Sequence, residues 1–78
     1  MGWAAADEKL VPELKSECAT VRSHLYICKN KTSALRLKLS SIAHAEKRVP
    51  MLASIIDAES NLEKAYQALY DIDTHLNR

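Results

Sequence analysis

Apolar side chains recur in the first half of the chain at alternating spacings of three and four residues. This is the a/d pattern of a heptad repeat, which aligns the apolar side chains in one stripe along a long helix. A single helix cannot bury such a stripe, so it must pack against another helix of this chain or of a partner. The a positions hold Val11, Cys18, Leu25, Thr32 and Leu39, and the d positions hold Leu14, Val21, Cys28, Leu35 and Ile42.

The second half of the chain carries a stripe of its own. Its a positions hold Ile55, Leu62, Leu69 and Leu76, and its d positions hold Met51, Ala58, Ala65 and Ile72. The two stripes are out of phase with each other, which indicates a turn or a sharp kink between them. We expect the a and d residues of the two stripes to form one core or to bind partner helices.

Both prolines follow a valine at the point where a stripe begins. Proline suits the first turn of a helix, where its missing N–H would form no hydrogen bond. Pro12 and Pro50 therefore predict two helix starts. The expected parts are a tail at 1–10 and one helical domain at 11–78, with helices at about 12–48 and 50–77.

The polar segment 29–33 leaves one alternative open. Thr32 or Ser33 could cap a new helix there, which would split the 12–48 helix and give a compact three-helix bundle. No glycine or proline interrupts the segment and the heptad continues through it, so a continuous helix is favoured. One glycine and two prolines among 78 residues suit helices better than a sheet. We predict an all-α fold with long amphipathic helices in an antiparallel helical hairpin or a coiled-coil assembly.

Charge is divided along the chain although the net charge is only +1. The segment 22–48 holds seven of the eleven Lys and Arg residues and a single acid, Glu46. The last thirty residues are acidic, with five Asp or Glu against Lys64 and Arg78. A basic segment followed by an acidic one favours antiparallel pairing of the two helices.

The heptad positions beside the stripes sharpen this prediction. The e positions of the 12–48 helix are basic, and those of the 50–77 helix include two acids. Antiparallel packing brings e positions next to e positions, whereas a parallel homodimer would place basic residues against basic residues. The residues expected to pair are Arg22, Lys29 and Arg36 with Glu59 and Asp73.

Residues with reactive side chains form no recognisable catalytic or metal-binding pattern. No two of the three histidines lie three or four residues apart. Cys18 and Cys28 would lie about 15 Å apart along one helix, too far for a disulfide between them. The only glycine is Gly2, so a glycine-rich phosphate loop is absent. We expect no catalytic residue, no metal, no cofactor and no enzyme activity.

The N-terminal segment lacks the basic start and apolar run of a signal peptide, and no stretch approaches the ~20 apolar residues of a membrane span. A soluble, cytoplasmic protein is therefore expected.

Residues 50–76 resemble snapin-like small coiled-coil subunits of the biogenesis of lysosome-related organelles complex. The matching positions are Pro50, Leu52, Ile55, Ile56, Ala58, Leu62, Ala65, Leu69, Ile72 and Leu76. The resemblance implies a small coiled-coil subunit of a cytosolic hetero-oligomeric assembly. Such an assembly would act in endosome and lysosome trafficking and contact SNARE or motor machinery.

The sequence thus predicts a helical scaffold or adaptor subunit that mediates protein–protein assembly. Its partners would be helices, in a hetero-oligomer or an antiparallel homo-oligomer, and no small-molecule substrate is expected. One alternative is a self-contained three-helix adaptor domain that binds proteins. A less favoured alternative is a helical protein that binds nucleic acid through the basic segment 22–48.

Overall fold

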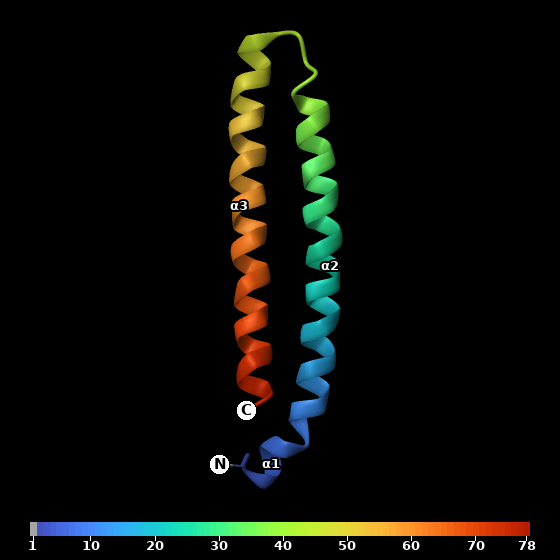
Figure 1. Cartoon of the computed structure of the whole chain (residues 1–78), viewed down its shortest axis with the longest axis vertical. Helices are drawn as coiled ribbons and strands as arrows, with labels where there is room; N and C mark the ends of the chain where they lie inside the picture. The colour runs from blue at the N-terminus through green and yellow to red at the C-terminus, as the bar shows by residue number, and fades with distance from the viewer. Residues whose placement is uncertain (1) are drawn as a thin grey trace.

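The computed structural model describes residues 2–78, and its helices form a long antiparallel hairpin (Figure 1). The elements are α1 (Ala5–Glu8), α2 (Leu10–Leu39) and α3 (Ala45–Leu76). The helices α2 and α3 lie side by side and residues 40–44 connect them, so both chain ends lie at the opposite end of the hairpin (Figure 1). The molecule measures 60 × 16 × 14 Å. The predicted all-α hairpin is confirmed.

The N-terminal segment is more helical than expected. The predicted tail at 1–10 contains α1, and α2 begins at Leu10; Met1 lies outside the described residues. The carbonyl of Ala4 accepts hydrogen bonds from the N–H groups of Asp7 and Glu8, both at 2.9 Å, which closes one helical turn. Pro12 has no N–H to donate to the carbonyl of Glu8, so the helix does not continue unbroken from α1 into α2.

The predicted end of the first long helix at residue 48 is wrong, because α2 ends at Leu39. The hydroxyls of Ser40 and Ser41 both donate to the carbonyl of Leu37, at 2.6 and 3.4 Å. Such local hydrogen bonds compete with the helical pattern and favour a helix end. The connection at 40–44 contains no glycine, and no residue in the described range 2–78 has a positive φ angle.

The predicted start of the second helix at Pro50 is also wrong, because α3 begins at Ala45 and contains Pro50 in its interior. His44 is extended, and its carbonyl accepts hydrogen bonds from the N–H groups of Lys47 and Arg48 at 3.2 and 2.9 Å. Arg48 also closes the connection, since its Nη1 donates to the carbonyls of Ile42 at 2.7 Å and Ala43 at 3.3 Å. These bonds start α3 before the proline.

The segment 29–33 continues α2 without a break. The hydroxyl of Thr32 donates to the carbonyl of Cys28 at 2.6 Å, four residues back in the same helix. Its polar group is therefore satisfied within α2 and does not cap a new helix. Across residues 2–78, none of the helices combines the length and apolar character that crossing a membrane requires.

Candidate interaction surface

The two long helices meet through their a and e positions. From α2, Cys18 and Leu25 at a positions and Arg22 and Lys29 at e positions are buried or half-buried, whereas the d positions between them are exposed. The helix α3 repeats this arrangement, because its a and e positions from residue 48 onward are all half-buried or buried: Arg48, Leu52, Ile55, Glu59, Leu62, Tyr66, Leu69, Asp73 and Leu76. Of its d positions, Ala58 alone is half-buried. The structure thus divides each predicted stripe into a row that faces the other helix and a row that does not.

The buried core of the hairpin is very small. Among the described residues, only Cys18 and Leu76 are buried, at 6% and 7% exposure. The Sγ of Cys18 donates to the carbonyl oxygen of Leu69 at 3.3 Å, so this thiol packs directly against the backbone of α3. Cys28 is exposed, and both cysteines are free thiols. The contact between α2 and α3 therefore covers little of the apolar surface of either helix.

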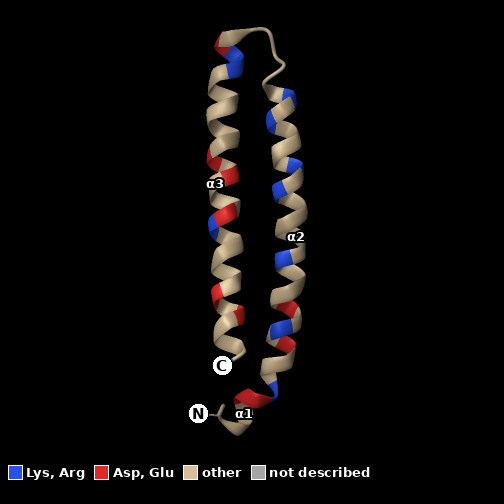
Figure 2. Ribbon diagram, in the orientation of Figure 1, with Lys and Arg blue, Asp and Glu red and all other residues tan. Residues whose placement is uncertain are grey.

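Ion pairs join the e positions of the two helices. Nη1 of Arg22 lies 3.8 Å from Oδ2 of Asp73, and Nε of Arg36 lies 2.7 Å from Oε1 of Glu59. Ser33 adds a hydrogen bond from its hydroxyl to the other carboxylate oxygen of Glu59 at 3.2 Å. Figure 2 shows the basic residues along α2 and the acidic residues along the neighbouring α3.

Lys29 forms its ion pair with Glu63, a residue that the heptad analysis did not select. The hydrogen bond to Glu63 raises the pKa of Lys29 above its ordinary value. The pKa of Glu63 is lowered, first by the bond from Lys29 and then by the bond from the Gln67 amide at 3.1 Å. The sequence could have indicated Glu63 as a partner, because it lies one helical turn after Glu59 and therefore on the same side of the helix.

Two tyrosines of α3 cover the cations of α2. The guanidinium carbon of Arg22 lies 4.8 Å from the ring centre of Tyr70, and Nζ of Lys29 lies 4.7 Å from that of Tyr66, both within cation–π range. The two rings meet edge to face with centres 5.2 Å apart. Hydrogen bonding with Tyr70 raises the pKa of Tyr66. An open hollow of about 440 Å³ lies between these tyrosines and Tyr26.

The remaining apolar row of each helix lies on the opposite side of the hairpin from this hollow. A d row lies about 60° around the helix from the a row, away from the e row, and antiparallel packing places the d rows of both helices on the same side. We call this surface the d face; it consists of Leu14, Val21, Cys28 and Leu35 of α2 and Met51, Ala58, Ala65 and Ile72 of α3.

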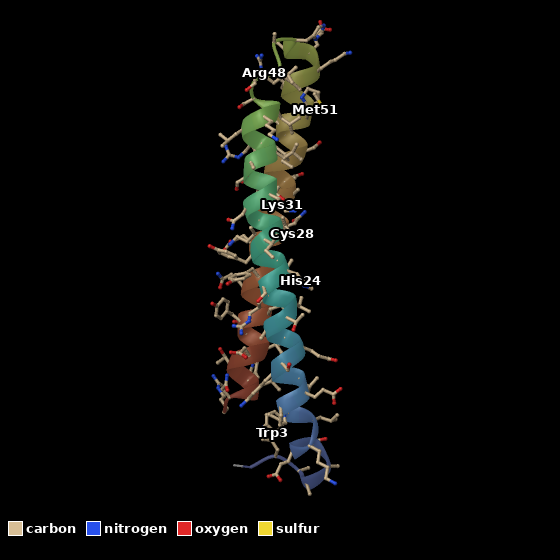
Figure 3. All side chains as sticks on the ribbon, turned by 90° about the vertical axis from the view of Figure 1, so that its right-hand side faces the viewer. Trp3, His24, Cys28, Lys31, Arg48 and Met51 are labelled. Atoms are coloured by element: carbon tan, nitrogen blue, oxygen red, sulfur yellow. The ribbon has the colours of Figure 1, made fainter. Side chains whose placement is uncertain are left out.

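The d face is largely exposed and apolar. Val21, Leu35 and Ile72 are exposed by 45%, 47% and 48%. Near the connection, Met51 lines a shallow hollow of about 370 Å³ together with Leu39, Pro50, Ser54 and Ile55. Figure 3 labels one d-face residue on each helix, Cys28 and Met51.

The predicted site residues are therefore distributed over two surfaces. Those between the helices are Val11, Cys18, Leu25, Leu39, Ile55, Leu62 and Leu69 with the five charged residues Arg22, Lys29, Arg36, Glu59 and Asp73. Those on the d face are Leu14, Val21, Cys28, Leu35 and Ile72, while Ile42 lies half-buried in the connection.

No group of three His, Cys, Asp or Glu side chains in the described part of the chain is placed to hold a metal ion. Comparisons of the chain with protein-family models, with curated proteins and with solved structures found no match. What the surface can do is therefore inferred from its own geometry.

Proposed function

We propose that this protein is a non-enzymatic helical scaffold or adaptor subunit whose d face packs against partner helices. The observation that carries the proposal is the exposure of the d rows of both helices on one side of the hairpin. A contiguous apolar surface of this kind on a small soluble domain is typical of an interaction site.

The energetics of burial support assembly. Full burial of a Leu, Ile, Val or Met side chain stabilises by about 1.5–3 kcal/mol, and the large d-face side chains are already half covered. Covering the rest of Leu14, Val21, Leu35, Met51 and Ile72 would contribute about 5 kcal/mol. That gain is as large as the whole stability of many small domains.

The charged residues favour this proposal over nucleic-acid binding. The candidates for phosphate contacts were Arg22, Lys29, Arg36, Lys31 and Lys38, and the first three each form an ion pair with an acid of α3. The hairpin itself thus neutralises three of the five candidate charges, which weakens the positive field for a polyanion. The resemblance of residues 50–76 would place such a subunit in a cytoplasmic assembly of endosome and lysosome trafficking.

Sedimentation equilibrium of the purified chain tests the proposal, with a variant that carries Val21→Asp and Leu35→Asp on the d face. We expect the wild-type chain to associate beyond its 8.7 kDa monomer or to remain a monomer of low thermal stability. The charged variant should not associate. Leu37→Asp is the matched control, since Leu37 is 62% exposed and lies off the d face.

A wild-type monomer that unfolds cooperatively at a high temperature would contradict the proposal. It would favour the alternative, a self-contained adaptor domain. Association that persists unchanged in the Val21→Asp, Leu35→Asp variant would show that another surface carries the contact.

A further inference from the structure

The d face has small side chains at its centre and large ones at both ends. Along α2, Cys28 lies between Val21 and Leu35. Along α3, the two alanines of the row lie between Met51 and Ile72. The order of side-chain sizes along the d face, large then small then large, is therefore the same from either end of the hairpin.

The centres of the two rows lie at the same level of the hairpin. Cys18 contacts Leu69, and Ser33 contacts Glu59. Cys28 lies between the first residues of these two pairs, so it lies beside the part of α3 between Ala58 and Ala65. One two-fold axis can therefore pass through the centre of both rows.

A two-fold axis at Cys28, perpendicular to the length of the hairpin, makes the d face complementary to itself. It places α2 antiparallel to the partner's α2, with Val21 opposite the partner's Leu35 and Cys28 opposite the partner's Cys28. On α3 it places Met51 opposite the partner's Ile72. Large side chains then fill the ends of the interface and small ones allow close approach at the centre, as in an isologous contact.

Charge at the rim of the d face selects the same axis. The rim of α2 is formed by its g positions, Glu17, His24, Lys31 and Lys38. The perpendicular axis brings Glu17 beside the partner's Lys38, and symmetry repeats the pair. The rim of α3 holds Ser54, Asn61, Ala68 and His75, with no Asp, Glu, Lys or Arg, so the contact between the two α3 helices brings no such charges together. An axis along the hairpin would place the charged rim of α2 against this uncharged rim and form no ion pair.

The size of the face agrees with a stable dimer. The 30 residues of α2 extend for about 45 Å at ~1.5 Å per residue. With the hairpin width of 16 Å, the face covers about 720 Å² in each copy. Stable interfaces bury about 800 Å² per partner.

From these observations we propose that the occupant of the d face is a second copy of this chain, in an antiparallel four-helix bundle whose two-fold axis passes between the two Cys28 side chains. This inference rests on the proposed function and names the partner helices that it requires. Packing of two antiparallel helical hairpins is a common way to build a four-helix bundle.

Crosslinking of the full chain tests the proposal, because the axis fixes which residues of the two copies meet. The Cys18→Ala variant keeps Cys28 as its only thiol and is oxidised with copper phenanthroline at low micromolar concentration. We expect a dimer by sedimentation equilibrium and nearly complete disulfide formation between the two copies on a non-reducing gel. A disulfide needs Cα atoms within about 7 Å, which only residues close to the axis reach.

The matched control carries Cys18→Ala, Cys28→Ser and Leu14→Cys. In the proposed dimer the two thiols of this variant lie at opposite ends of the bundle, about 40 Å apart, so we expect a dimer with at least tenfold less disulfide. Equal crosslinking at positions 14 and 28 in a dimeric protein would overturn the antiparallel two-fold arrangement.

Failure of this inference differs from failure of the proposed function. A wild-type monomer without Cys28 crosslinking overturns the second copy as the occupant. If that monomer has low thermal stability and gains stability with a helical partner of another sequence, the scaffold function stands. If it unfolds cooperatively at a high temperature, both are wrong.

Discussion

The position of a leucine within the heptad decides what that side chain contributes to the hairpin. Leu25 is half-buried at an a position between the helices, whereas Leu37 is 62% exposed on the same helix. We predict that Leu25→Ala destabilises the protein by about 2–3 kcal/mol, because it removes packed apolar volume. Leu37→Ala should cost less than about 0.5 kcal/mol. Urea denaturation followed by circular dichroism measures both, and equal losses would mean that Leu25 does not pack against α3.

For single residues, the sequence predicted the partners of the charges better than it predicted the buried face of each helix. The heptad positions predicted that Arg22, Lys29 and Arg36 pair with acids of the second helix. The structure pairs Arg22 with Asp73 and Arg36 with Glu59. The heptad assignment alone did not indicate that the e positions, and not the d positions, would face the other helix. That choice depends on ion pairs and tyrosine contacts across α3, and an apolar pattern of one helix carries no information about them.

The two prolines lie at different positions within their helices, so we expect their replacement to affect stability differently. Pro12 is the third residue of α2, where an N–H would have no acceptor within α2, but Pro50 is the sixth residue of α3 and cannot donate to the carbonyl of Glu46. We predict that Pro50→Ala stabilises the protein by about 1–3 kcal/mol and that Pro12→Ala changes stability by less than about 0.5 kcal/mol. Urea denaturation measures both variants, and a loss of stability in Pro50→Ala would show that the proline supports the start of α3.

The presence of two long helices was predictable from the sequence, but the residues at which these helices begin and end were not. Two long stripes required two long helices, and the structure contains them as α2 and α3. The boundary between them was misplaced because Pro50 is a strong start signal, whereas the bonds that end α2 at Leu39 come from Ser40 and Ser41. Serine forms such bonds in many contexts, so its presence alone does not mark a helix end.

The charge distribution over the whole molecule can be tested by reversing it. Arg22→Glu with Arg36→Glu turns two ion pairs into repulsive contacts, and we predict a loss of about 1–2 kcal/mol. Adding Glu59→Arg and Asp73→Arg should restore most of that loss, because each pair is then attractive again. Stability is measured by urea denaturation at low salt.

Retention on heparin serves as the contrasting measurement for the same variants. If the first pair of substitutions abolishes retention at low salt and leaves stability unchanged, the basic residues act on a polyanion and not on α3. The fourfold variant has the same net charge as the wild type. A recovery of its stability would therefore come from restored ion pairs between α2 and α3, which is the structural role of these basic residues.

The short connection at 40–44 has a consequence for the order in which the hairpin forms. Arg48 and Ile42 are six residues apart in the chain, whereas Cys18 and Leu69 at the far end are 51 residues apart. Contacts near the connection close the smallest loops, and each formed contact shortens the loop that the next one must close. The helices can therefore zip together from the connection towards the chain ends, a route that allows fast folding. The last residues to join, beside α1, are also the first to separate when the hairpin frays.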